Sequence, residues 1–369
     1  MVKKRITVVF GTRPEAIKLA PLILLLKQQN LVETRVIITG QHKEMTNQVL
    51  ELFSFQPDLD MNLMKTGQSL TFVTQKVLEG LEKDFSKYLP DLIIVQGDTT
   101  SAFSAALAGF YKKIPVAHIE AGLRTNNLME PFPEELNRRL ISQITSLNFA
   151  PTQLSTENLR KNDVPGKIFI TGNTVIDSLL MISKKCIMPK FKKIVWKEQK
   201  VILVSIHRRE NWGENINQIA LAILEIVDKF SDIAVLLPLH KNSIVREPLK
   251  KILGSHSRIT LSEPLDYLQM ISSLKNCFLV LTDSGGLQEE APAFGKPVLV
   301  LRDTTERQEG ILAGTSKIVG TKKINIIKEC SNLINDQKKY NLMSEVINPY
   351  GDGNASQKIM EICFQHLGI

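Results

Sequence analysis

The chain has 369 residues, of which 43% are hydrophobic and 23% charged, and its formal net charge is +8. This composition is typical of a soluble globular protein and excludes an intrinsically disordered chain. The length suits two domains better than one core. No apolar segment is long enough to span a membrane, so no membrane partner is expected.

The excess of positive charge is concentrated in one part of the chain. Seven lysines lie between Lys184 and Lys200, against a single acid, Glu198. Aromatic residues are not interleaved with basic ones in the way that single-stranded nucleic-acid binding requires. We therefore interpret this run as a solvated linker and expect no nucleic-acid partner.

Neither a metal nor a cofactor is expected. The histidines form no HExxH motif, and the chain has no GxGxxG fingerprint and no GxSxG elbow. The cysteines are far apart and form no CxxC pair, which predicts reduced thiols in a cytoplasmic protein rather than disulfides or a zinc site. They are Cys186, Cys277, Cys330 and Cys363.

Short β-rich runs alternate with segments of helical spacing along the whole chain. The expected strands are Ile6–Phe10, Val36–Thr39, Leu92–Gln96, Val116–Ile119, Leu147–Ala150, Ile168–Thr171, Val201–Ile206, Ala234–Leu237, Ile259–Leu261, Phe278–Leu281, Val298–Leu301 and Lys317–Val319. The helical segments include Ala16–Lys27, Thr99–Tyr111, Glu134–Ile144 and Ile216–Phe230. This order predicts right-handed βαβ units and parallel sheets with helices on both faces.

The two halves of this alternation predict two domains. We expect an α/β fold of two doubly wound, Rossmann-like domains that face each other across a cleft. The N-terminal domain is expected to comprise residues 1–172 and the C-terminal domain residues 173–350, with 173–200 as a lysine-rich linker. A final amphipathic helix, Ala355–His366, is expected to pack, as part of 351–369, back onto the first domain.

Polar residues follow the buried strands of the first half. Arg13 opens a helix after the first strand, and Lys18 lies about one turn further on, so both could flank an anion. Asp98 and Glu120 each follow a later strand. Asp98 could equally be a helix N-cap, and Arg13 and Glu15 could be surface capping charges, but capping explains Glu120 poorly.

Two acids, Glu134 and Glu135, open the helix at Glu134–Ile144. Acids in a first turn stabilise the helix dipole, which is the simplest explanation for both. The alternative is that one of them joins Asp98 and Glu120 in proton transfer.

The strand ends of the second half carry cations and a Gly-Gly turn. His207 and Arg208 follow one strand and His240 the next, which indicates an anionic ligand. Ser284-Gly285-Gly286 connects a buried strand to a helix, a turn at which backbone N–H groups can bind phosphate. Because Arg302, Asp303, Glu306 and Arg307 follow the next strand, we interpret this region as half of a nucleotide-diphosphate site.

Nine motifs in order resemble the non-hydrolysing UDP-N-acetylglucosamine 2-epimerases. They are GTRPEAIKLAP, QGDTTSAF, HIEAGLRT, PFPEELNRR, ITGNTVID, HRREN, TDSGGLQEEAP, GKPVLVLRDTTER and NPYGDG. The resemblance covers Ile6 to Gly353. It implies the two-domain fold of GT-B glycosyltransferases, a homodimer, UDP held mainly by the second domain, and interconversion of UDP-GlcNAc and UDP-ManNAc.

The resemblance also implies roles for individual residues. The positions implicated in chemistry are Asp98, Glu120, Glu134 and His207, and the positions that bind substrate are Arg13, Lys18, Leu265, Met270, Ser284, Gly285, Gly286, Glu290 and Arg307. Some members carry a second, regulatory UDP-GlcNAc site, which Gln41, Glu135, Arg208 and His240 match. Glu44 and Gly67 replace a Gln and an Arg of that site. Gln308 replaces a proline after Arg307, and Met270 an aromatic residue.

The C2 proton of a UDP-hexosamine is not acidic, because no carbonyl is adjacent to it. In the family, UDP is expelled from C1 as a base removes this proton, giving 2-acetamidoglucal, and UDP then adds back. Three alternatives stay open: an epimerase of a modified UDP-hexosamine such as a diacetamido uronic acid, a GT-B glycosyltransferase, and a nucleotide-sugar sensor without turnover.

Overall fold

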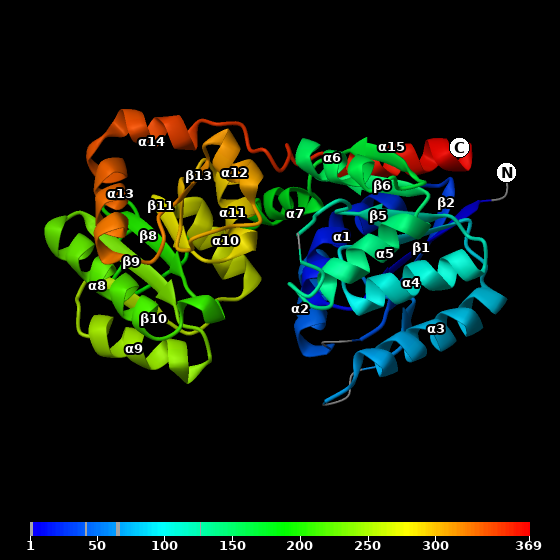
Figure 1. Cartoon of the computed structure of the whole chain (residues 1–369), viewed down its shortest axis with the longest axis horizontal. Helices are drawn as coiled ribbons and strands as arrows, with labels where there is room; N and C mark the ends of the chain where they lie inside the picture. Colours follow the sequence, from blue (N-terminus) through cyan, green and yellow to red (C-terminus); the bar gives the residue numbers. More distant parts are fainter. Residues whose placement is uncertain (1–2, 41–42, 64–66, 126) are drawn as a thin grey trace. The chain divides into compact units, whose positions relative to one another are not determined.

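The structure, a computed structural model, describes residues 3–40, 43–63, 67–125 and 127–369. The chain divides into two compact units (Figure 1). Unit 1 comprises Met1–Ser178 and Tyr350–Ile369, and unit 2 comprises Leu179–Pro349. The division falls inside helix α7 (Thr174–Ser183), which occupies the first part of the segment expected to be a linker.

The described residues of unit 1 form a seven-stranded parallel sheet in the order β3-β2-β1-β4-β5-β6-β7. Its strands are β1 (Lys4–Phe10), β2 (Val32–Ile38), β3 (Leu59–Asp60), β4 (Leu92–Gln96), β5 (Val116–Ile119), β6 (Leu147–Ala150) and β7 (Lys167–Ile170). Its helices are α1 (Arg13–Lys27), α2 (Lys43–Phe53), α3 (Leu70–Lys87), α4 (Thr100–Tyr111), α5 (Glu134–Ile144), α6 (Gln153–Lys161) and α15 (Ala355–Leu367).

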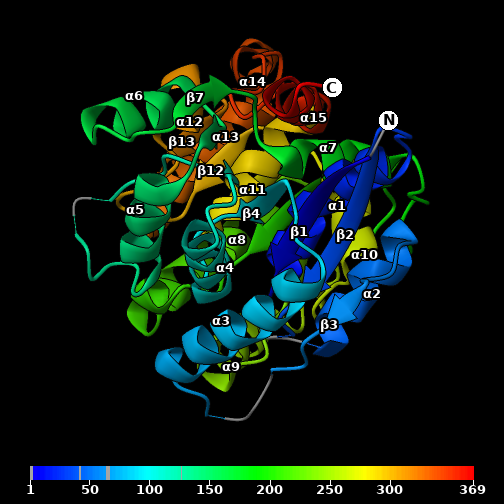
Figure 2. The ribbon, with the colours of Figure 1, turned by 90° about the vertical axis from the view of Figure 1, so that its right-hand side faces the viewer.

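Helices cover both faces of this sheet. Figure 2 shows α3, α4 and α5 on one side of the strands and α1 and α2 on the other. Strands enclosed in this way read as continuous apolar runs, and Ile6, Val8, Val9 and Phe10 of β1 are all fully buried. The C-terminal α15 packs against α1. Its first N–H groups are capped by buried Asp177 of α7, whose carboxylate accepts from Ser356 N at 2.7 Å.

Unit 2 repeats the same plan with a six-stranded parallel sheet in the order β10-β9-β8-β11-β12-β13. Its strands are β8 (Lys200–Ser205), β9 (Ile233–Pro238), β10 (Ile259–Ser262), β11 (Leu279–Thr282), β12 (Val298–Val300) and β13 (Ser316–Ile318). Its α-helices are α8 (Glu214–Lys229), α9 (Ser243–Leu253), α10 (Tyr267–Asn276), α11 (Gly285–Glu290), α12 (Gln308–Ala313), α13 (Lys323–Asn335) and α14 (Gln337–Ser344), and its 3₁₀ helices are η1 (Arg209–Asn211) and η2 (Ala291–Phe294).

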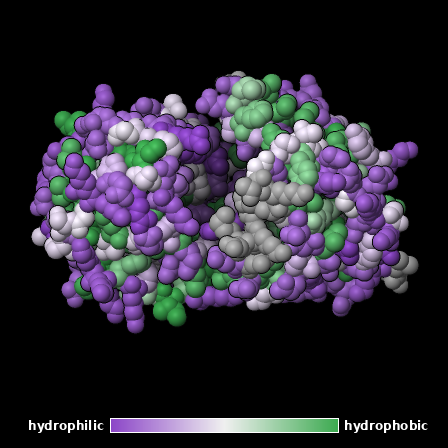
Figure 3. Space-filling model, turned by 90° about the horizontal axis from the view of Figure 1, so that it is seen from below, coloured by the Kyte–Doolittle hydropathy of each residue, from purple (hydrophilic) through white to green (hydrophobic). Residues whose placement is uncertain are grey.

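The predicted fold class, two parallel-sheet α/β domains, is confirmed. Every predicted strand is present, with ends shifted by a few residues, and β3 is an additional strand of two residues. The four cysteines are free thiols. Within the described residues, no helix is long and apolar enough to cross a membrane. Hydrophilic side chains cover most of the surface seen in Figure 3.

Candidate active site

In both sheets the strand order reverses between two neighbouring strands, β1 and β4 in unit 1 and β8 and β11 in unit 2. Ligands of open α/β sheets bind at the carboxyl ends of such strand pairs. Gly11 to Arg13 and Gly97-Asp98 follow the first pair. His207-Arg208 and Asp283 to Gly286 follow the second. The predicted site residues Asp98, His207 and Ser284 therefore lie at the strand ends where open α/β sheets bind ligands.

Buried Glu15 holds the turn between β1 and α1. Its Oε2 accepts from the backbone N–H groups of Gly11, at 3.0 Å, and Thr12, at 2.7 Å, and its Oε1 accepts from Thr99 Oγ1 at 2.7 Å. Burial raises the pKa of Glu15, and these hydrogen bonds oppose the rise. Glu15 therefore caps α1, as the capping alternative predicts, but it does so from a buried position and not from the surface. Arg13 is the first residue of α1 and is half-buried.

Lys18 of α1 and Glu120, which follows β5, form a largely buried ion pair. Lys18 Nζ lies 2.7 Å from Oε1 and 2.6 Å from Oε2 of Glu120. Gln96, the last residue of β4, also donates to Glu120 Oε2. The backbone of Glu120 has φ +63°, a left-handed conformation that is unfavourable for a non-glycine residue and is found mostly at functional sites. The turn after β5 thus directs this carboxylate towards α1 and β4.

Asp98 pairs with an arginine that the sequence reasoning did not single out. Arg138 of α5 donates to Asp98 Oδ2 at 2.6 Å and lies 3.4 Å from Glu135 Oε2. The neighbouring Asn137 donates to the Asp98 carbonyl at 2.9 Å. The PFPEELNRR motif therefore positions the loop after β4. Arg138 was missed because an arginine within a helix gives no sequence signal that it faces a neighbouring strand.

Burial raises the pKa of Asp98 above its ordinary value. Arg138 and Lys18 lower this pKa, while the negative charges of Glu120 and Glu134 raise it further. Glu134 is the first residue of α5 and is half-buried. Asp98, Glu120, Glu134, Lys18 and Arg138 therefore form one electrostatic cluster in unit 1, with two acids and two bases around Asp98.

His118 of β5 is a second residue that sequence reasoning did not select. Its ring is fully buried, and Nε2 lies 2.7 Å from the carbonyl of Gly97, the residue before Asp98. Burial lowers the pKa of His118 to about 4, so the ring is neutral and Nε2 carries the proton that it donates to Gly97. Its Nδ1 has no hydrogen-bond partner among the described residues. His118 thus anchors the turn that carries Asp98.

In unit 2, buried Asp283 accepts hydrogen bonds from the residues that follow β8. Its carboxylate accepts from His207 N at 3.0 Å, Arg208 N at 2.9 Å and Asn211 Nδ2 at 3.0 Å, and lies 2.9 Å from His207 Nδ1. Burial raises the pKa of Asp283, but the hydrogen bond and charge of His207 and the backbone donors lower it further, so the net shift is downward. Asp283 therefore orients the His207 ring, whose side chain is partly exposed.

A network of arginines and acids follows β12. Arg302 lies 2.7 Å from Glu306 Oε2 and 2.5 Å from Glu210 Oε1, and Arg208 donates to Glu306 Oε1 at 3.1 Å. Arg307 pairs with buried Glu289 of α11 at 2.5 Å. Burial raises the pKa of Glu306, but Arg307 and Arg302 outweigh burial and lower it to about 2. The network is thus fully charged and fixes the loop that carries Arg307.

The turn between β11 and α11 is open to a ligand. Gly286 is exposed, and a Cβ added to it would meet only Ser284 Oγ, at 3.9 Å, whereas one added to Gly285 would lie 3.1 Å from Glu306 Oε1. Ser284 precedes the helix, and Glu290 is its last residue, half-buried. Packing within the chain therefore does not require glycine at 286.

Leu265 and Met270 lie at the start of helix α10. Leu265 precedes α10, and Met270 lies within its first turns, beyond the capping residue Asp266. Both side chains are half-buried.

The match to a family model decides which of the predicted chemistries applies. The model described as UDP-N-acetylglucosamine 2-epimerase matches residues 25–363. The chain belongs to the UDP-N-acetylglucosamine 2-epimerase family. The predicted family and the predicted isomerase class are therefore confirmed.

Relatives of this family resemble the chain over its whole length. UDP-N-acetylglucosamine 2-epimerase of Escherichia coli (strain K12) is 46% identical over 367 residues, or 97% of each chain. The Neisseria meningitidis UDP-GlcNAc 2-epimerase bound to UDP-GlcNAc is 47% identical, with a TM-score of 0.87 over 98% of this chain and 100% of that one. An S. aureus protein in complex with UDP is 41% identical, with a TM-score of 0.88 over 99% and 97%.

Three of the four residues that the resemblance assigns to a regulatory site lie in the described chain, and their contacts are as follows. Glu135 is fully buried and accepts from Arg139 Nε at 2.6 Å and Thr125 N at 2.9 Å. The ring of His240 stacks on His207 with centroids 6.4 Å apart. Arg208 pairs with Glu306, and Gln41 lies outside the described residues.

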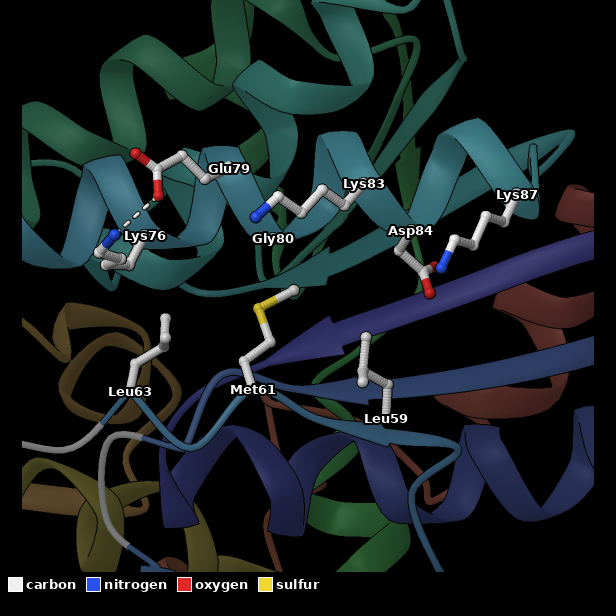
Figure 4. A pocket seen from close by; sticks show the side chains of 9 residues that line it. All are labelled: Leu59, Met61, Leu63, Lys76, Glu79, Gly80, Lys83, Asp84 and Lys87. Carbon is white, nitrogen blue, oxygen red and sulfur yellow. Dashed lines mark hydrogen bonds and ion pairs between the residues drawn. The ribbon is translucent and has the colours of Figure 1, made fainter.

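A groove of about 400 Å³ lies elsewhere in unit 1, between α3 and the segment at β3. Figure 4 shows apolar side chains facing α3, and Lys76 paired with Glu79 at 2.7 Å on that helix. The lining residues are Leu59, Met61, Leu63, Lys76, Glu79, Gly80, Lys83, Asp84 and Lys87. None of the predicted site residues lines it, so we assign it no part in catalysis.

Proposed function

We propose that the chain interconverts UDP-GlcNAc and UDP-ManNAc by inverting C2. Family membership supports the reaction, and a relative 47% identical carries UDP-GlcNAc in its structure. The observation that carries the proposal is the acid cluster of unit 1, in which Glu120 and Glu134 are close enough to Asp98 to raise its pKa. A transferase would not need three acids at the sugar end of its site.

The proposed chemistry is elimination followed by re-addition. A carboxylate takes the C2 proton, and the electron pair of that C–H bond forms a C1=C2 double bond. The C1–O bond breaks at the same time, and UDP leaves with its electron pair, giving 2-acetamidoglucal. The reverse steps, with the proton delivered to the other face of C2, give the epimer. No oxidant, reductant or metal enters this balance.

The acids of unit 1 suit the proton transfers. A carboxyl group with a raised pKa, such as Asp98, exchanges protons more readily near neutral pH than an ordinary aspartate. Glu134 and Glu120 shape that pKa and are the other candidates. Lys18, within reach of Glu120, and Arg13 would meet the charge that develops on the departing diphosphate.

The groups of unit 2 suit the binding of UDP. The exposed turn Ser284-Gly285-Gly286 would admit the diphosphate to backbone N–H groups, with the His207 ring and the Arg307 guanidinium as further hydrogen-bond donors. Glu290 would accept hydrogen bonds from sugar hydroxyls, and Leu265 and Met270 would pack against uracil. Asp283 and Glu289 would hold His207 and Arg307 in place.

Proton NMR of the protein with UDP-GlcNAc in heavy water tests the proposal. We expect an epimeric mixture with deuterium at C2, and the same result after EDTA treatment. Epimerisation without deuterium uptake would contradict elimination. Transfer to an acceptor with no change at C2 would indicate a glycosyltransferase. Turnover of only a modified UDP-hexosamine would indicate the alternative epimerase.

We also propose that the protein acts as a homodimer. Apolar side chains are exposed on α5 and in the loop before it: Leu128, Met129, Phe132, Leu136 and Leu140. Covering them in a second copy would remove this apolar surface from water. Light scattering should give twice the chain mass for the wild type and less for Leu136→Glu/Leu140→Glu.

Regulation at Gln41, Glu135, Arg208 and His240 stays a prediction. It is tested by measuring whether UDP-GlcNAc accelerates the turnover of UDP-ManNAc.

A further inference from the structure

The lysine-rich segment between α7 and β8 combines positive charge with exposed apolar side chains. We call residues 184–197 the basic segment. Ile187 is 82% exposed, Val195 49% and Met188 44%. The lysines at 184, 185, 190, 192, 193 and 197 are exposed as well. A solvated linker explains the lysines but not the three apolar side chains between them.

Contacts with unit 2 hold the basic segment in this arrangement. Buried Ile194 packs into the unit, and Ser272 Oγ of α10 donates to the Ile187 carbonyl at 2.5 Å. Trp196 Nε1 donates to the Pro189 carbonyl at 2.6 Å, and its ring lies 6.5 Å from that of Phe191. The two aromatic rings thus contact each other, while the aliphatic side chains face outward.

The basic segment contains lysines but no acidic residue. Lys184, Lys190, Lys192 and Lys197 form no ion pair within the part of the chain that the structure describes, and no acid occurs between 184 and 197. Lysines elsewhere in unit 2 do have acidic partners, such as Lys317 with Glu329 at 2.7 Å and Lys323 with Glu225 at 2.7 Å. Lys184, Lys190, Lys192 and Lys197 therefore form a local concentration of positive charge without ion-pair partners in the described chain.

We propose that the basic segment docks the protein reversibly on an anionic phospholipid surface. Lysines near such a surface are attracted to its headgroups, each strengthening binding roughly fivefold. Exposed aliphatic side chains between them can enter the headgroup boundary and add to binding. Nucleic acid fits less well, because single strands are bound by stacking on aromatic rings, and Phe191 and Trp196 already contact each other.

Co-sedimentation with phospholipid vesicles tests this proposal. Vesicles of phosphatidylcholine alone would be compared with vesicles containing equal parts of phosphatidylglycerol. We expect the full-length protein to sediment with the anionic vesicles only, and less so as salt is raised. Equal binding to both vesicles, or to neither, at low salt would overturn the proposal.

A charge variant with a matched control assigns the binding to the segment. Lys184→Gln/Lys190→Gln/Lys192→Gln/Lys197→Gln should weaken vesicle binding at least about a hundredfold, from four factors of roughly five reduced by screening. The control removes four exposed lysines elsewhere in unit 2: Lys250→Gln/Lys251→Gln/Lys328→Gln/Lys338→Gln. Equal weakening by both variants would show a net-charge effect and overturn the assignment. Circular dichroism and epimerisation, which neither variant should change, verify the fold.

An apolar variant and a competitor separate lipid from other anions. Ile187→Ser/Val195→Ser keeps every charge and should still weaken vesicle binding several-fold. If it leaves vesicle binding unchanged while double-stranded DNA displaces the wild type from the vesicles, the segment is a general polyanion site and the lipid proposal is wrong.

Discussion

Asp98 follows β4 in unit 1 and Asp283 follows β11 in unit 2, so the two carboxylates occupy matching places in two doubly wound sheets. Burial raises the pKa of both. Around Asp98, Arg138 opposes burial but Glu120 and Glu134 reinforce it, and the net shift is upward. Around Asp283, His207 and backbone N–H groups outweigh burial, and the net shift is downward.

Burial acts on both acids, and what differs is whether the surrounding cations and donors overcome it. Near Asp98, Arg138 and Lys18 do not overcome burial, which Glu120 and Glu134 reinforce, and the result is a group that can hold and release a proton. Extra donors near Asp283, and extra arginines near Glu306, favour permanent anions that orient cations. The proposed division, with proton transfer in unit 1 and UDP binding in unit 2, follows from this difference.

The strongest test of unit 1 is Glu134→Gln. If Glu134 transfers protons, turnover should fall by about 10²–10⁴-fold, while UDP affinity and melting temperature stay close to wild type. Such an enzyme could also release 2-acetamidoglucal and UDP before the second half-reaction. Turnover, UDP titration and NMR of the products measure these effects.

The control for this variant must be chosen from the structure. Glu135→Gln is unsuitable because buried Glu135 pairs with Arg138 and Arg139, so the change would also destabilise α5. Glu82→Gln, on α3 with a side chain 70% exposed, is the better control and should be silent. Near-normal turnover of Glu134→Gln would leave Asp98 and Glu120 to carry the chemistry.

The matching test of unit 2 is Gly286→Val. The site has room for a side chain within the chain itself, so the protein should fold. Its bulk would obstruct the diphosphate, and UDP affinity should fall roughly tenfold to a hundredfold, the cost of forcing atoms into a packed contact. Isothermal titration with UDP measures it.

Gly109→Ala is the control for Gly286→Val, because it should affect stability and not UDP binding. A Cβ there would lie 2.8 Å from Ile93 Cδ1 and 2.9 Å from Val116 Cγ2, so this variant should lose stability and keep its UDP affinity. Wild-type affinity in Gly286→Val would mean that the turn has no contact with the nucleotide.

The pH dependence of stability should separate the two kinds of acid. Glu306 has a folded pKa of about 2 against an ordinary 4.5. Its contribution, roughly 3 kcal/mol at most, is present above pH 4.5 and lost as pH falls towards 2. Urea unfolding should therefore show Glu306→Gln less stable than wild type at pH 7, with the gap closing at low pH.

Asp98→Asn should change the stability at neutral pH in the opposite direction to Glu306→Gln. Because the folded state raises the pKa of Asp98 above 3.8, its ionisation opposes folding as pH rises through the folded pKa. The variant should therefore gain stability relative to wild type towards neutral pH. A loss at pH 7 would mean that the pair with Arg138 outweighs burial.

The sequence predicted the strands well because buried parallel strands are continuous apolar runs, as in Ile6–Phe10 and Val201–Ile206. It missed β3, whose two residues are too short for any pattern. It placed Asp98, Glu120 and His207 at strand ends, where the structure has them. The alternation of strands and helices was enough to place these residues, since the carboxyl ends of parallel strands all lie at one edge of the sheet.

The contacts between these residues were beyond sequence reasoning. Nothing in the spacing shows that Arg138 reaches Asp98 across forty residues, or that Glu15 is buried, because both depend on how helices lie on the sheet. The same holds for the basic segment, whose lysines were evident but whose exposed Ile187 and Val195 were not.

Substitution of His118 should have the smallest effect on turnover, but it tests specifically how the turn that carries Asp98 is positioned. It does not reach Asp98 itself; it donates from Nε2 to the Gly97 carbonyl and so positions the turn that carries Asp98. His118→Phe fills the buried site but removes this bond. Turnover should fall about tenfold, since small displacements of a reacting group are costly, while KM stays nearly unchanged. His118→Asn, whose side chain can still donate, should recover part of the loss. A variant that only loosened the core would lower the melting temperature in both cases and show no such recovery. Measuring kcat, KM and melting temperature of the two variants side by side therefore separates a positioning residue from a packing one.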